Sequence, residues 1–181
     1  MNILVIHGST RQNGNTEALA KLSVPENETT HIYLRDSQIQ PIQDARHSKE
    51  GFQDVSDDFS GIFDQILEHE VLIFATPIYW YSMTCIMKTF IDRFSQSIRE
   101  EKYKDFKDRM KSKYVYVIAV GGDQPSVKGL PLIQQFEYIL QFFGTTLNGY
   151  ILGEANKPGE IHNDKAALHT ASVLKEKMSN Y

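Results

Sequence analysis

The stretch of sequence that decides the fold is Ile3-Leu4-Val5-Ile6-His7-Gly8-Ser9-Thr10-Arg11-Gln12-Asn13-Gly14-Asn15-Thr16. Its first four residues form an apolar run without alternation, which is typical of a strand buried on both faces of a parallel sheet. The run ends at a polar loop that contains glycine, and a helical pattern opens at Asn15-Thr16. The stretch therefore predicts a strand, a loop and a helix N-terminus in direct succession.

The same pattern of strand followed by helix recurs along the chain. Further strands are predicted at 30–34, 71–75, 114–120 and 145–152; the apolar run at 71–75 is the clearest, and Asn148-Gly149 weakens the last. Apolar residues at three- and four-residue spacing predict helices at 57–70, 83–99, 130–143 and 163–178, besides the one that opens at Asn15. Strands that alternate with amphipathic helices indicate a parallel sheet with helices on both faces. We therefore predict one α/β domain over residues 1–181, a flavodoxin-like doubly wound sheet of five parallel strands in the order 2-1-3-4-5.

Composition limits the functions open to this domain. The chain of 181 residues fits one domain, and its formal charge of −4 argues against a general nucleic-acid binder. Its single cysteine excludes a disulfide framework within the chain and a four-cysteine metal site, and it favours the cytoplasm. The N-terminus does not resemble a signal peptide, and no apolar run approaches the roughly 20 residues of a membrane span. We therefore expect a cytoplasmic protein that binds neither nucleic acid nor membrane.

The loop after the first predicted strand has the composition of an anion site. Unpaired backbone N–H groups and the helix dipole favour an anion at a helix N-terminus, and Gly8 and Gly14 permit close backbone approach. The polar side chains that could donate to phosphate oxygens are Ser9, Thr10, Arg11, Asn15 and Thr16. The loop lacks the Gly-Lys-Ser/Thr of nucleotide triphosphatases and the dinucleotide G-x-G-x-x-G. We therefore predict a phosphate monoester as the ligand; the alternative is an ordinary turn with an Asn or Thr N-cap.

The loop after the third predicted strand holds three consecutive aromatic residues, and its sequence is Thr76-Pro77-Ile78-Tyr79-Trp80-Tyr81-Ser82. Ligands of open α/β sheets bind outside the carboxyl ends of the strands, so this loop is expected beside the phosphate loop. Three consecutive aromatic side chains cannot all enter one core, and a planar aromatic ligand along the loop would gain stacking area. The alternative is a core plug or a dimer contact by Tyr79 or Trp80.

These two motifs together resemble the flavodoxin-like NAD(P)H-dependent FMN reductase family. Gly-Ser-x-Arg-x-x-Gly-Asn-Thr at 8–16 looks like the FMN-phosphate loop of that family, and Thr-Pro-Ile-Tyr-Trp at 76–80 looks like its isoalloxazine loop. The similarity covers nearly the whole chain, including Gly121-Gly122 and the segment 157–161. The chain departs from many relatives, including iron–sulfur flavoproteins, because its loop at 39–47 lacks their closely spaced cysteines, which excludes a thiolate-held cluster there.

The resemblance also implies a site and a reaction. FMN would be the cofactor, NADPH or NADH the electron donor, and a flavin, quinone or other small molecule the electron acceptor. The protein would be a homo-oligomer, dimer or tetramer, with the flavin near the interface. No catalytic side chain and no metal ligand is assigned, because the flavin N5 carries the chemistry. The cofactor-binding residues implied are Ser9, Thr10, Arg11, Gly14, Asn15 and Thr16 at the phosphate, Pro77, Ile78, Tyr79, Trp80 and Tyr81 along the flavin, and Gly121 and Gly122 at its pyrimidine edge.

Other functions were compared with this interpretation. A flavodoxin-type one-electron carrier is usually more acidic, and only rapid anaerobic reduction by NAD(P)H would exclude it. A response-regulator receiver needs an acidic cluster after the first strand, and His7-Gly8-Ser9-Thr10 has none. The third alternative is an FMN-binding module without turnover, and only a turnover measurement distinguishes it from the enzyme.

Four features outside the motifs have structural interpretations. Cys85 is predicted to be a small core residue, and His7 a structural histidine whose hydrogen bonds are satisfied. Asn163 is predicted to be an N-cap. Residues 99–113 carry mixed charge and suit a solvated helix or loop, with a lid or a dimer element as alternatives.

Overall fold

Five parallel strands form one sheet in the computed structural model, which describes residues 1–180. The strand order is β2-β1-β3-β4-β5, so the predicted flavodoxin-like order is confirmed. The connection reverses direction between β1 and β3, and this is the point where ligands bind in such sheets. The strands are β1 (Ile3–His7), β2 (Thr29–Tyr33), β3 (Val71–Pro77), β4 (Tyr114–Gly121) and β5 (Leu147–Glu154).

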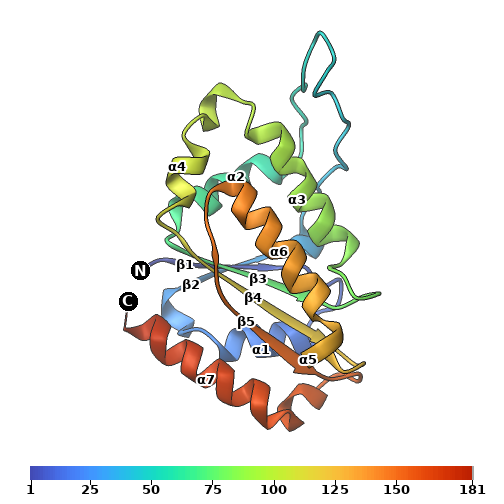
Figure 1. Cartoon of the computed structure of the whole chain (residues 1–181), viewed down its shortest axis with the longest axis vertical. Helices are drawn as coiled ribbons and strands as arrows, with labels where there is room; N and C mark the ends of the chain where they lie inside the picture. Colours follow the sequence, from blue (N-terminus) through green and yellow to red (C-terminus); the bar gives the residue numbers. More distant parts are fainter. Residues whose placement is uncertain (181) are drawn as a thin grey trace.

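Helices cover both faces of the sheet (Figure 1). One face carries α1 (Asn15–Leu22) and α7 (Lys165–Ser179). The other face carries α2 (Phe59–Glu68), α3 (Cys85–Ser97), α4 (Phe106–Met110) and α6 (Leu130–Phe143). The short helix α5 (Pro125–Lys128), which the sequence analysis missed, lies after β4. Four 3-10 turns complete the fold at Glu26–Glu28, Leu34–Asp36, Glu101–Tyr103 and Glu160–Asn163.

The apolar run of β1 is buried because it sits in the middle of the sheet. Its alternate residues enter two separate cores, since successive side chains of a strand point to opposite faces. Leu4 and Ile6 pack with the side chains of α2, α3 and α6, whereas Ile3 and Val5 pack with those of α1 and α7. The run at the start of the sequence therefore holds the two layers of helices together.

The charged segment 99–113 packs on the core instead of covering the carboxyl ends of the strands. Tyr103, Phe106 and Met110 are buried, and the Phe106 ring stacks on Phe63 with a centroid distance of 5.2 Å. Helix α4 leads directly into β4, so it lies at the end of the sheet where β4 begins (Figure 1). The lid interpretation is therefore wrong.

The polar segment 37–58 projects from the body of the molecule, at the top of Figure 1. Its base is anchored by Arg93 of α3, whose Nη1 lies 2.5 Å from Asp57 Oδ2 and donates to the Gln40 carbonyl oxygen at 3.0 Å. Both charged side chains are 1% exposed. Removing the two charges from water costs free energy, and their attraction and their further hydrogen bonds offset that cost.

Two local predictions are wrong. Cys85 is exposed, because it is the first residue of α3 and faces away from the buried stripe of that helix. The N-cap of α7 is Asp164 rather than Asn163, since the Asp164 carboxylate accepts a hydrogen bond from the backbone N–H of Ala167 at 3.0 Å.

Within residues 1–180, no helix has both the length and the apolar character required to cross a membrane. Across the same residues, no three His, Cys, Asp or Glu side chains gather closely enough to hold a metal ion.

Candidate functional site

Two adjoining cavities lie at the carboxyl ends of β1, β3 and β4, and we call them together the cleft. They share Ile78, Gly121 and Gly122, and their volumes are about 200 and 150 Å³. The larger cavity is lined by Ser9, Arg11, Gly14, Asn15, Thr16, Pro77, Ile78, Tyr79, Val120, Gly121, Gly122, Ala155 and Asn156. The smaller is lined by Ile78, Trp80, Tyr81, Gly121, Gly122, Asp123, Pro125, Lys128 and Gly129. The structure thus brings together every predicted site residue except Thr10, which lines neither cavity.

The N-terminus of α1 opens into the larger cavity. Its N-cap is Gly14, so no side chain caps the helix and the first backbone N–H groups remain for a ligand. Ser9 and Arg11 stand beside this end, and the Ser9 hydroxyl accepts a hydrogen bond from the Arg11 backbone N–H at 3.2 Å. A free helix end with an adjacent guanidinium suits a phosphate group.

Asn15 contributes to this end through its backbone. Its side-chain amide donates to the Lys157 carbonyl oxygen at 2.8 Å, and its Oδ1 accepts from the Gly159 backbone N–H at 2.9 Å. This side chain therefore ties the loop after β5 to the start of α1, and one of the two N–H groups of its amide is engaged there.

Behind the loop, buried ionic groups hold its conformation. Glu17 is 3% exposed, and its carboxylate accepts from the Asn13 backbone N–H, Lys21 and Arg35. Burial alone would raise the pKa of Glu17, but the hydrogen bond and charge of Lys21, with the Asn13 N–H and Arg35, lower it. Arg35 also donates to the Arg11 carbonyl oxygen at 3.2 Å. These contacts fix the turn that leads into α1.

His7, the last residue of β1, is buried beneath the same loop. Its Nε2 lies 2.9 Å from His31 Nδ1 and its ring stacks on Tyr33, whereas its Nδ1 has no partner. Burial, followed by the neighbouring His31, lowers the pKa of His7 to about 3. The imidazole is therefore neutral at physiological pH, and the prediction of a satisfied histidine holds for one of its two nitrogens.

Tyr79 and Ser82 form a tight turn at the end of β3. Each backbone N–H donates to the carbonyl oxygen of the other residue at 3.0 Å. The two residues between them, Trp80 and Tyr81, have φ angles of 48° and 63°. Turns of this shape favour Asn and Gly, because side chains are strained at positive φ. The turn nevertheless displays Trp80, whose side chain is 95% exposed.

All non-glycine residues with positive φ among residues 1–180 lie in the loops of the cleft. They are Asn13, Trp80, Tyr81 and Gln124. Such conformations cost about 1–3 kcal/mol each and cluster at functional sites, where the surrounding structure holds them. Their distribution marks the cleft as the functional region of the molecule.

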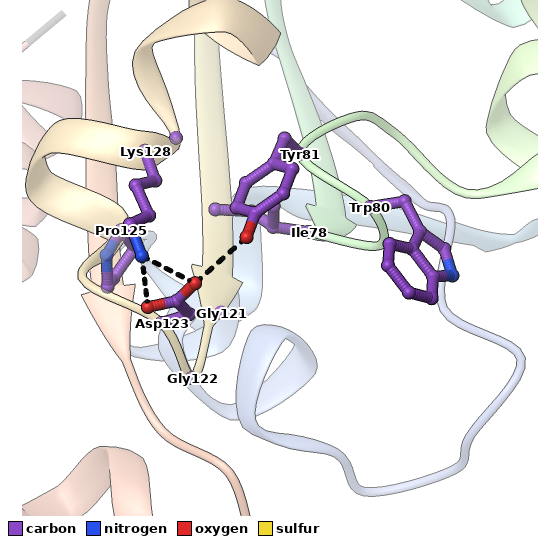
Figure 2. A pocket seen from close by; sticks show the side chains of 9 residues that line it. Ile78, Trp80, Tyr81, Gly121, Gly122, Asp123, Pro125 and Lys128 are labelled. Carbon is purple, nitrogen blue, oxygen red and sulfur yellow. Dashed lines mark hydrogen bonds and ion pairs between the residues drawn. The ribbon is translucent and has the colours of Figure 1, made fainter.

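Three side chains meet at the far end of the cleft, as Figure 2 shows. The Tyr81 hydroxyl donates to Asp123 Oδ2 at 3.0 Å, and Lys128 Nζ lies 2.6 and 2.8 Å from the two oxygens of the same carboxylate. Lys128, with a further contribution from Tyr81, lowers the pKa of Asp123. Trp80 points away from this group (Figure 2). The three side chains join the loop after β3 to the loop after β4.

Gly121 and Gly122, at the end of β4, permit close approach of neighbouring protein loops. A Cβ at Gly122 would collide with the side-chain amide of Asn156, and one at Gly121 would lie 3.1 Å from Ile78 Cβ. The glycines therefore let neighbouring loops close on the end of β4, and this narrows the floor of the cleft.

Sequence reasoning found Gly121 and Gly122 but missed the other cleft residues at the end of β4 and in the segments after β4 and β5. They are Val120, Asp123, Pro125, Lys128, Gly129, Ala155 and Asn156. A usable signal was available, since both loops follow strands whose carboxyl ends lie at the same edge of the sheet.

The cleft has the chemistry that FMN requires. One end offers backbone N–H groups and Arg11 for a phosphate, and the other offers aromatic side chains and a glycine floor for a planar ring. Such a cleft on a doubly wound sheet is characteristic of the flavodoxin-like FMN proteins.

Comparison with known proteins agrees with this class. The family model for NADPH-dependent FMN reductase matches residues 1–145. The chain is 53% identical over 174 residues, 96% of each protein, to YwqN of Bacillus subtilis, which is named for an NAD(P)H-dependent FMN-containing oxidoreductase. It is 25% identical to an iron-sulfur flavoprotein of Methanocaldococcus jannaschii, over 99% of this chain and 96% of that one.

A solved structure is also similar to this chain in both fold and sequence. The Trp repressor binding protein from Bacillus subtilis superposes with a TM-score of 0.80 at 46% identity, over 96% of this chain and 97% of that one. The chain belongs to the NADPH-dependent FMN reductase family. It is an oxidoreductase that uses FMN as cofactor and NADPH or NADH as electron donor.

Proposed function

We propose that FMN lies along the cleft with its phosphate at the N-terminus of α1 and its ring between the loops after β3 and β4. The observation that carries this placement is the uncapped end of α1, which faces the same cleft as the aromatic turn. Ser9, Arg11, Gly14 and Thr16 would hold the phosphate, together with the backbone of Asn15. Pro77, Ile78, Tyr79, Trp80, Tyr81, Gly121 and Gly122 would hold the ring.

Bound FMN supplies hydride acceptance from NADPH or NADH and electron delivery to a second substrate. The residues of the cleft bind and orient the cofactor. The tight turn at Tyr79–Ser82 presents backbone groups to the ring edge, and the two backbone hydrogen bonds between Tyr79 and Ser82 hold Trp80 and Tyr81 in their strained conformations. No side chain of the cleft is assigned a proton-transfer role.

We propose that the electron acceptor is a small planar molecule such as a quinone or a free flavin. The support is the exposure of Trp80 and Tyr79 beside an open cleft, since a planar acceptor gains stacking area on such side chains. We expect a homo-oligomer, because Tyr138 and Phe142 expose an apolar surface beside a hollow of about 290 Å³ between α3 and α6. We expect it in the cytoplasm, because the chain has a single cysteine.

The absorbance spectrum of the purified protein tests this function. We expect a yellow protein whose flavin band bleaches when NADPH or NADH is added without oxygen, and recovers when a quinone is added. A protein that binds no FMN contradicts the proposal. Bound FMN that NAD(P)H does not reduce favours the one-electron carrier or the binding module instead.

Two variants test the placement of the phosphate. Arg11→Met should weaken FMN binding about tenfold, whereas Thr10→Ala, whose side chain lies outside the cleft, should leave it unchanged. Riboflavin lacks the phosphate, so its affinity should be the same in both variants. Equal loss of FMN and riboflavin binding in Arg11→Met would place the phosphate elsewhere.

A further inference from the structure

Tyr81, Asp123 and Lys128 form a hydrogen-bonded group at the far end of the cleft, and the proposed placement of FMN does not use these bonds. Tyr81 comes from the loop after β3, Asp123 from the loop after β4, and Lys128 from the end of α5. Their side chains converge on the Asp123 carboxylate from the two walls of the smaller cavity (Figure 2). They form the link that joins the walls at this end, and we call it the clasp.

The clasp stands where the backbone is strained. Tyr81 at one wall and Gln124 at the other both have positive φ, and Gln124 directly follows Asp123. A strained turn persists only when its surroundings hold it. The hydrogen bond from Tyr81 to Asp123 is the contact by which the second wall holds the first, and Lys128 fixes the carboxylate that accepts it.

The side chains of the clasp are partly exposed to solvent. Asp123 and Lys128 are 54% and 41% exposed, so water competes for both. Exposed ion pairs contribute little to stability. The pair of Asp123 and Lys128 lies within the second wall, and the contact between the two loops is the hydrogen bond from Tyr81, which is itself 45% exposed, to Asp123. A single exposed hydrogen bond between two loops opens and closes easily, which suits a gate better than a permanent support.

We propose that the clasp gates the cleft: while it is closed, Tyr81, Asp123 and Lys128 retain the ring of FMN and obstruct its entry. This inference rests on the proposed placement of FMN. Its consequence is kinetic, because a gate slows both dissociation and association of the cofactor. The structure thereby assigns these residues to retention of FMN as a prosthetic group, whereas a protein without the clasp would exchange FMN rapidly.

Stopped-flow fluorescence of FMN tests the gate, since it measures both rate constants without any turnover. We expect Asp123→Ala to raise the dissociation rate constant about fivefold and the association rate constant about threefold. Tyr81→Phe keeps the ring and loses only the hydroxyl, and it should raise both constants about threefold. The double variant should equal Asp123→Ala alone, because both changes open the same clasp.

The matched control is Asp108→Ala, which removes an exposed carboxylate from an ion pair with Lys111, at the end of the sheet opposite the cleft, and should change neither rate constant. A rise in the dissociation rate alone would overturn the gate, because it indicates lost contact with bound FMN. Unchanged rates, or effects that multiply in the double variant, would also overturn it while leaving the proposed function intact. Failure of the wild-type protein to bind FMN would overturn both.

Discussion

The Glu17 carboxylate accepts a hydrogen bond from the backbone N–H of Asn13, 3.1 Å away, where the chain takes a φ of 52°. The same carboxylate lies 3.0 Å from Arg35 Nη1, and Arg35 in turn holds the Arg11 carbonyl oxygen. A buried acidic side chain thus stabilises the turn that presents the N-terminus of α1 to the cleft, although its own charge would repel a phosphate.

Glu17→Ala should weaken FMN binding about tenfold, which corresponds to about 1.4 kcal/mol. The Asn13 N–H loses its acceptor and Arg35 loses its partner, so the turn no longer holds the donors in place for the phosphate. Quenching of FMN fluorescence on titration measures the affinity. Glu176→Ala, an exposed change on α7, is the control. If riboflavin binding falls by the same factor, Glu17 does not act through the phosphate end.

Arg93→Met should lower the free energy of unfolding by about 3–5 kcal/mol, because it leaves the buried Asp57 carboxylate without its cation. The double variant Arg93→Met, Asp57→Asn should regain part of this loss, since the uncompensated charge is gone. Urea unfolding followed by circular dichroism measures both. Lys104→Met breaks the exposed pair with Glu101 and should stay within about 0.5 kcal/mol of wild type. No recovery in the double variant would mean that packing of the Arg93 side chain, rather than charge, carries the stability.

The sheet could be predicted because its signal is local. An unalternating apolar run such as Ile3–Ile6 is typical of a buried parallel strand, and five predicted strands that alternate with helices fit the observed order. The exposure of Cys85 escaped prediction for a geometric reason. Cys85 precedes the buried Met87 by two residues, about 200° around the helix, so it faces solvent although its neighbours suggest a core.

The residues of the cleft were predictable as a group but not in their separate roles. Whether the Asn15 amide faces a ligand or another loop depends on Lys157 and Gly159, which are more than 140 residues away in sequence. The link between Asp123 and Tyr81 likewise depends on the left-handed conformation of neighbouring residues, which no composition signal reveals. Contacts between side chains that lie far apart in the sequence can be identified only in the three-dimensional structure.

Stability should fall as the pH drops from 8 to 5, because His7 stays neutral in the folded state. Its folded pKa is about 3 and its unfolded pKa about 6.5, so only the unfolded chain binds the proton in this interval. The loss attributable to His7 at pH 5 is about 2 kcal/mol. Burial also lowers the pKa of His31, which adds a loss in the same direction. Urea unfolding at pH 8, 6.5 and 5 measures the dependence.

His7→Gln isolates the contribution of the buried imidazole to this pH dependence. Glutamine does not titrate, so the variant should lose about 2 kcal/mol less than wild type between pH 8 and pH 5. The groups that face His7 are His31, Glu17, Lys21 and Arg35. Glu17 and Lys21 keep their charge over this interval, because the pKa of Glu17 is lowered and that of Lys21 raised. Equal slopes for the variant and the wild-type protein would contradict the prediction.

Trp80→Asn should stabilise the protein by about 0.5–1 kcal/mol, because asparagine tolerates positive φ and the exposed indole buries little. Gln124→Asn relieves the same kind of strain outside the lining of the cleft and should stabilise similarly. The two variants should differ in rate. Trp80→Asn should slow anaerobic reduction of FMN by NADPH about tenfold, whereas Gln124→Asn should not, because only Trp80 presents a ring beside the cleft. If both variants gain stability and neither loses rate, the strained tryptophan serves a contact between subunits rather than turnover.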